Sequence, residues 1–147
     1  MIDRGLTHVA LPVTDLDASL TFYQKYAGLE VVHRRRDEST DSQVAWISDF
    51  TRPFVVVLIE VGEVPHPLVP IAHLGVGCKS RDEVDQLLHQ AQQEGHPVWG
   101  PTDSGYPVGY WALISDPDHH TLEISHGQEV ALTIERSTPR TAEPEAS

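Results

Sequence analysis

The chain has 147 residues, 39% hydrophobic and 22% charged, which is enough to bury one compact core. Its formal net charge of −12 would repel a nucleic-acid backbone or an anionic membrane, so we expect neither as a partner. The arginine run at 34–36 is too short for a basic patch and is interpreted as a solvated strand end. One cysteine, Cys78, allows neither an internal disulfide nor a cysteine zinc site. The sequence shows no signal peptide and no run of about twenty apolar residues, so we expect a cytoplasmic protein.

The first half of the chain begins with an alternating stretch at 7–13, which predicts a half-buried strand. Asp15 can cap a following helix, whose apolar face repeats at helical spacing, and Gly28 can end that helix in the left-handed conformation. Three strand-like runs follow, at 29–33, 43–47 and 54–61. Residues 5–62 therefore predict a βαβββ module.

The second half repeats this order. Ser80 and Glu83 have the spacing of a capping box, an apolar stripe follows, and Gly95 can end the helix. Strand-like runs lie at 71–78, 97–99, 111–115 and 121–125. Residues 71–128 therefore predict a second βαβββ module, joined to the first by the proline-rich linker at 63–70.

Helices that interrupt mostly antiparallel strands indicate an α+β protein, which we expect to form a single domain over 1–128. Residues 129–147 are polar and contain prolines, and they predict a disordered tail.

Polar residues fall at matching places in the two halves. His8 and His73 stand in the first strand-like run of each half, and Glu60 and Glu123 stand in the last. Alternation along the strands turns His8, His73 and Glu123 away from the helix-facing side of the sheets. These three side chains are therefore candidate ligands on one concave face.

Two imidazoles and a carboxylate without a thiolate suit one divalent metal ion. Fe2+ is favoured, and Mn2+, Ni2+, Co2+ and Zn2+ remain open. Three protein ligands leave positions that two neighbouring oxygens of a small-molecule substrate could fill, and the metal would then act as a Lewis acid.

The stretches 7–23, 72–76 and 116–123 resemble the vicinal oxygen chelate superfamily, which includes glyoxalase I, methylmalonyl-CoA epimerase, extradiol dioxygenases and the fosfomycin and bleomycin resistance proteins. The resemblance implies two βαβββ modules forming curved mixed sheets around a metal-binding cleft. It implies His8, His73 and Glu123 as the metal ligands, and it favours a homodimer. Whether the site forms within one chain or between two stays open.

The resemblance leaves the reaction open. A three-ligand site favours dioxygenase-like chemistry, with Glu123 in the site and Tyr110, His126 or Glu60 as the acid–base group. Glu60 is more simply a solvated strand-end residue, but as a fourth ligand it would favour a glyoxalase- or epimerase-like isomerase or lyase. A non-catalytic protein that binds a drug or metabolite is the alternative from another class. We expect His119 and His120, in the turn before Glu123, to be exposed.

Overall fold

The computed structural model describes residues 1–137, which contain eight strands and three helices. In chain order these are β1 (His8–Val13), α1 (Leu16–Ala27), β2 (Glu30–Asp37), β3 (Ser42–Ser48), β4 (Val55–Glu60), β5 (Leu74–Gly77), α2 (Arg81–Gln93), β6 (Val98–Asp103), β7 (Tyr110–Ser115), β8 (Thr121–His126) and α3 (Val130–Arg136). The predicted α+β fold of two βαβββ modules is confirmed.

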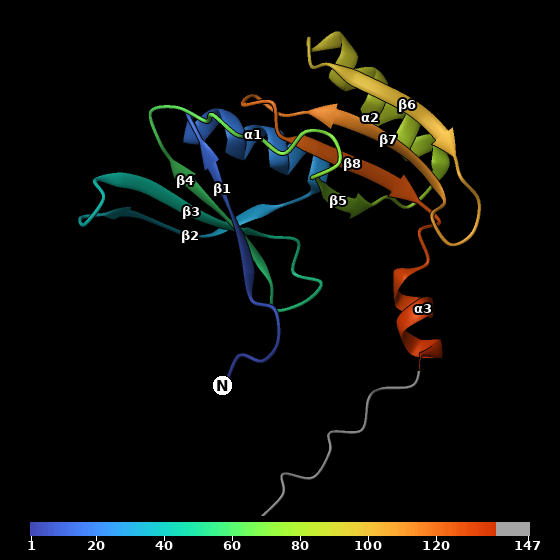
Figure 1. Ribbon diagram of the computed structural model, residues 1–147, viewed down its shortest axis with the longest axis horizontal. Helices are drawn as coiled ribbons and strands as arrows, with labels where there is room; N and C mark the ends of the chain where they lie inside the picture. Colours follow the sequence, from blue (N-terminus) through green and yellow to red (C-terminus); the bar gives the residue numbers. More distant parts are fainter. Residues whose placement is uncertain (138–147) are drawn as a thin grey trace, which may run out of the picture.

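Each module forms its own four-stranded mixed sheet (Figure 1). The strand order is β1-β4-β3-β2 in the first sheet and β5-β8-β7-β6 in the second. In each sheet the first strand pairs in parallel with the last, and the other pairs are antiparallel. Consequently β1 and β5, the strands nearest the two predicted histidine ligands, are both edge strands.

Helix α1 begins and ends where the sequence predicts. Asp15 accepts a hydrogen bond from the backbone N of Ala18, and Gly28 follows the helix with a left-handed φ of 64°. A second carboxylate serves the same helix end, because Glu60 Oε2 accepts a hydrogen bond from the backbone N of Leu16 at 2.8 Å. The last residue of β4 is thereby tied to the first turn of α1.

Helix α2 starts at the predicted capping box. The Ser80 hydroxyl accepts a hydrogen bond from the backbone N of Glu83 at 3.1 Å. The Glu83 carboxylate reaches back to the backbone N of Lys79, one residue earlier than in an ideal capping box. Gly95 follows the helix with a φ of 87°, a conformation that favours glycine.

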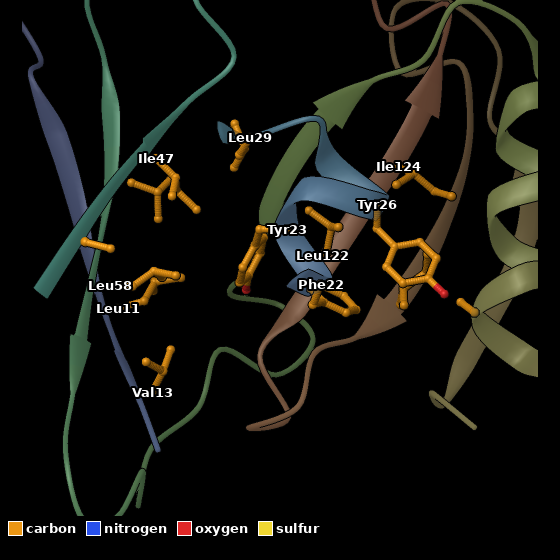
Figure 2. Packing of buried hydrophobic residues seen from close by; sticks show 14 of the residues in the cluster. Leu11, Val13, Phe22, Tyr23, Tyr26, Leu29, Ile47, Leu58, Leu122 and Ile124 are labelled. Atoms are coloured by element: carbon orange, nitrogen blue, oxygen red, sulfur yellow. The ribbon is translucent and has the colours of Figure 1, made fainter. Parts of the chain in front are cut away.

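One hydrophobic core joins the two modules. Helix α1 lies between the two sheets, and the ring of Tyr23 at its centre is fully buried (Figure 2). The side chains that share this core come from both sheets: Leu11, Val13, Ile47, Leu58, Leu122 and Ile124. Val84 and Ala91 of α2 complete it over the second sheet. Since both sheets turn their apolar faces toward this shared core, their other faces point outward.

The turn at 116–120 fastens the second module to the first. The Tyr23 hydroxyl donates to Asp116 Oδ2 at 2.7 Å, and the Thr14 backbone N and hydroxyl donate to the Asp118 carboxylate at 3.0 and 2.5 Å. Burial and the neighbouring Asp116 charge raise the pKa of Tyr23, so its hydroxyl stays a hydrogen-bond donor.

His120 extends this contact between the modules. Its Nδ1 accepts a hydrogen bond from the backbone N of Leu68, so Nε2 carries the proton and donates to the carbonyl of Pro12 at 2.8 Å. Both ring nitrogens are used and the side chain is buried, which makes the prediction of an exposed His120 wrong. His119 is exposed, as predicted.

Two segments differ from the sequence interpretation. Strand β5 starts at Leu74, so His73 precedes the strand instead of lying within it. Helix α3 occupies Val130–Arg136, where a disordered tail was predicted, and none of its residues is buried. The rest of that predicted tail, 138–147, lies outside the described residues. Within residues 1–137 no helix is long and apolar enough to cross a membrane.

Candidate metal centre

His73 and Glu123 meet on the outward face of the second sheet. Leu122 and Ile124 face the core, so Glu123 between them points the other way. His73 Nε2 lies 3.0 Å from Glu123 Oε2. Gly75 pairs with Glu123 across the ladder, and its lack of a side chain leaves room beside the carboxylate. A single chain thus brings two of the three predicted ligands together.

Backbone carbonyls orient the His73 ring. Its Nδ1 lies 3.0 Å from the carbonyl oxygen of Pro70 and 3.1 Å from that of Ile71. A carbonyl oxygen can only accept, so Nδ1 carries a proton, and the other ring nitrogen, Nε2, is turned toward the Glu123 carboxylate. A histidine held in this way has the orientation that metal-ligating histidines have in proteins.

Glu123 is buried, with 8% of its surface exposed, so its carboxylate oxygens need polar partners. The Gln128 side-chain amide donates to Glu123 Oε1 at 3.3 Å. Among the described residues the only ion-pair partner of Glu123 is His73. A buried carboxylate beside the Nε2 atom of a histidine has the donor atoms of a cation site.

His8 lies on the outward face of the first sheet. Val9 and Leu11 turn toward the core, so His8 at the start of β1 turns away from it. The Thr7 hydroxyl lies 2.8 Å from His8 Nδ1. His8 borders a hollow of about 540 Å³ over the outward face of this sheet, whose lining includes Trp46 and Val57.

The three predicted ligands are not gathered within one chain. In residues 1–137 no three His, Cys, Asp or Glu side chains lie close enough to hold a metal ion. The reason is the shared core, because His8 is on one sheet and the pair of His73 and Glu123 is on the other, each on the face that points outward.

Glu60, the possible fourth ligand, faces the helix side. It pairs in register with Val13, whose side chain is fully buried in the core, and its carboxylate accepts from the Leu16 backbone N. The structure therefore does not bring Glu60 to the face that carries His8.

Replacing Glu60 by alanine is expected to lower the free energy of unfolding by about 1 kcal/mol, because the N-terminus of α1 loses an acceptor. The metal content should not change. Urea denaturation and metal analysis of Glu60→Ala test both statements. Glu63→Ala, an exposed linker carboxylate, is the matched control and should alter neither quantity. Loss of metal in Glu60→Ala alone would place Glu60 in the site.

Tyr110 and His126 also lie away from Glu123, contrary to their predicted place in the site. They pair opposite each other on the helix side of the second sheet. The Tyr110 hydroxyl donates to Asp85 of α2 at 2.5 Å, and His126 Nδ1 lies 3.1 Å from the carbonyl of Cys78. The hydrogen bond to Asp85 and burial raise the pKa of Tyr110. The side chains of Tyr110 and His126 therefore form hydrogen-bond contacts on the helix side of the sheet.

Two further side chains belong to the surroundings of Glu123. Trp111 shares the outward face with Glu123, since it pairs with Ser125 across the ladder, and its indole N donates to the Ser104 hydroxyl. Strand alternation predicts this placement of Trp111. Gln128 comes after the strand has ended, and no pattern in the sequence points to its contact with Glu123.

Paired βαβββ modules with a histidine and a glutamate on an outward sheet face define an α+β protein with a candidate metal centre. Residues 5–124 match the Glyoxalase/Bleomycin resistance protein/Dioxygenase superfamily. The chain belongs to this superfamily, as its resemblance to the vicinal oxygen chelate proteins predicted.

Three known proteins illustrate the similarity. An uncharacterized protein of Pseudomonas aeruginosa is 39% identical over 127 residues, 84% of this chain and 89% of the relative. The trypanothione-dependent glyoxalase I of Leishmania major superposes with a TM-score of 0.71 at 20% identity, covering 90% of this chain and 94% of the other. A fosfomycin resistance protein of Listeria monocytogenes, complexed with Mn(II) and a dihydroxypropylphosphonic acid, has a TM-score of 0.68 at 18% identity, covering 90% and 99%. The two solved structures share the fold of this chain.

Proposed function

We propose that this protein is a divalent-metal-dependent enzyme that acts on a small molecule with two adjacent oxygen donors. The observation that carries the proposal is the pair of His73 and Glu123, 3.0 Å apart between Nε2 and Oε2. The backbone carbonyls behind His73 and the Gln128 amide behind Glu123 hold both groups in the orientation of ligands. The superfamily includes metal-binding enzymes, and the listerial relative was crystallised with Mn(II).

The third ligand in this proposal is His8 of a second copy of the chain. His8 begins the edge strand β1, and His73 immediately precedes the edge strand β5. An edge strand can approach another chain without displacing a strand of its own sheet. A homodimer that places β1 of one copy next to β5 of the other would assemble two equivalent sites, each with His8 from one chain and His73 with Glu123 from its partner.

The donor set of two imidazoles and one carboxylate fits Fe2+ best in this proposal, with Mn2+, Ni2+, Co2+ and Zn2+ as alternatives. When bound, such an ion would supply Lewis-acid stabilisation to two neighbouring substrate oxygens. The chain itself would hold the ion through His8, His73 and Glu123, and the 540 Å³ hollow beside His8 would receive the substrate.

Among the superfamily's reactions we favour dioxygenase-like chemistry. Isomerases and epimerases must move a proton to and from carbon, which needs an acid–base group in the site. The three candidates for that role, Glu60, Tyr110 and His126, all make contacts on the helix side of their sheets. Lyase or isomerase chemistry would therefore need a group that faces the site only after dimerisation or substrate binding.

Metal analysis tests the proposal directly. The untagged protein, purified without chelator, is expected to hold about one divalent ion per chain. His73→Ala should lose that ion, while His89→Ala, which removes an exposed imidazole of α2, should retain it. A wild-type protein that holds no metal and binds none when metal is added would contradict the proposal and favour a drug- or metabolite-binding protein.

A further inference from the structure

The hollow beside His8 is lined by more basic than acidic side chains. The chain has 22 acidic and 10 basic residues, so an average surface region would be acidic. This hollow is instead lined by two arginines, Arg35 and Arg52, and by a single carboxylate, Asp3. Its other walls are mostly apolar, including Val32, Trp46, Phe54, Val55 and Val57.

Arg35 reaches the hollow because strand β2 alternates. Its neighbours in the arginine run are engaged elsewhere: Arg34 donates to Asp17 of α1 at 3.0 Å, and Arg36 pairs with Asp41 in the following turn. Arg35 between them points to the opposite face of the sheet. All three arginines are exposed near the end of β2, as the sequence predicts, and Arg35 differs from the other two only in the face of the sheet from which it projects.

The Arg35 guanidinium has two long contacts, and both leave its hydrogen-bond donors available. It lies 5.9 Å from the centre of the Trp46 ring, within the range of a cation–π contact. Its nearest ion-pair partner, Asp37, is 3.9 Å away, at the outer limit of an ion pair. A guanidinium that stacks on an aromatic ring is oriented to bind a carboxylate or phosphonate through its N–H edge.

Arg52 comes to the same hollow from the segment before β4. Its only hydrogen bond within residues 1–137 is a long one, 3.5 Å to the Thr51 hydroxyl, and it forms no ion pair there. Asp49 is a nearby carboxylate, and its pKa is lowered overall. Burial acts to raise this pKa, but the hydrogen bonds from Thr51 and the Arg52 charge together outweigh the effect of burial. The Arg52 guanidinium thus keeps most of its donors for another partner.

We propose that Arg35 and Arg52 form an anion-binding subsite, and that the natural substrate is a small organic anion with an apolar body. The apolar walls would hold the body, and the two guanidiniums would bind its carboxylate or phosphonate group. Because His8 borders the same hollow, the substrate would extend from the metal ligands to the arginines. The position of the reacting atoms in this inference rests on the proposed function. The binding of the anion by the two arginines does not depend on it.

Calorimetric titration of the full-length protein with benzoate, phenylphosphonate and the neutral benzyl alcohol tests the subsite. We expect one or both anions to bind and benzyl alcohol to bind at least tenfold more weakly, since charge-assisted hydrogen bonds contribute roughly a tenfold or greater gain in affinity. Arg35→Gln and Arg52→Gln should each weaken anion binding by about tenfold or more. The stronger of the two anions identifies the charged group that the subsite prefers.

Matched controls lie on either side of Arg35. Arg34→Gln and Arg36→Gln remove the same charge from the same strand, and they should change the affinity by less than about twofold. If all four variants lose the same amount of anion affinity, the effect is one of overall charge and the proposed subsite is wrong. The subsite is also wrong if neither anion binds, or if benzyl alcohol binds as tightly as the anions. Repeating the titration on His73→Ala separates the two proposals. Anion binding that persists there, and still depends on Arg35, supports the subsite even if the metal proposal fails.

Discussion

Chains with His8→Ala and chains with His73→Ala are each expected to bind no metal alone, and to recover metal binding when they are co-expressed. If the site lies between two chains, a mixed dimer has one site that lacks both histidines and one that has all three ligands. Random assembly makes about half of the dimers mixed, so the mixture should hold about one quarter of the wild-type metal per chain. Mixed dimers isolated through two different peptide tags should hold about half of it.

The control for this experiment is a pair of substitutions within one module. His73→Ala and Glu123→Ala fall on the same side of the proposed interface, so a mixed dimer of these chains contains no intact site. Co-expression should therefore restore nothing. His8→Ala with Glu123→Ala should behave like the first pair. If no combination restores metal, although the wild type binds it, then the two-chain site is wrong.

Asp116→Ala is expected to lower the free energy of unfolding by about 3–5 kcal/mol, although Asp116 is not a candidate ligand. Its carboxylate accepts hydrogen bonds from the Tyr23 hydroxyl and from the backbone N of Asp118 and His120. Burial raises the pKa of Asp116, and the hydrogen bonds from Tyr23 and His120 act against that increase. Alanine would leave all three buried donors without an acceptor. Urea denaturation, with the slope checked for two-state behaviour, measures the loss.

Tyr23→Phe provides the comparison, because it removes one donor and leaves the carboxylate with two. It should cost about 1 kcal/mol, and the double variant should be less destabilised than the sum of the two single variants. A loss below about 1 kcal/mol in Asp116→Ala would mean that water reaches the donors, and that this contact between the modules contributes little.

The local structure was predictable because its causes are local. Asp15 and Ser80 cap their helices, and Gly28 ends the first one, through contacts within a few residues of each position. Alternating apolar residues identified the strands and the direction of Glu123 for the same reason. The superfamily followed from motifs that lie in these same elements.

The arrangement of the candidate site could not be predicted in the same way. Whether His8 meets His73 depends on how two sheets pack around α1, and strand periodicity carries no information about that packing. Tyr110 is different, because it alternates with the buried Ala112 and Ile114, and that alternation places it on the helix side of the sheet and not in the site. Strand alternation also explains why Arg35 projects from the opposite face to Arg34 and Arg36.

The turn at 116–120 also bears on how the chain folds. It joins Tyr23 to Asp116, 93 residues apart in sequence, and Thr14 to Asp118, 104 residues apart. Contacts of such high sequence separation slow folding, because a long loop must close before they form. During synthesis, Thr14 and Tyr23 of the first module could form these hydrogen bonds only after the turn at 116–120 had left the ribosome. Although the two halves repeat one pattern, they should unfold in a single transition, and neither half should be stable as a separate fragment.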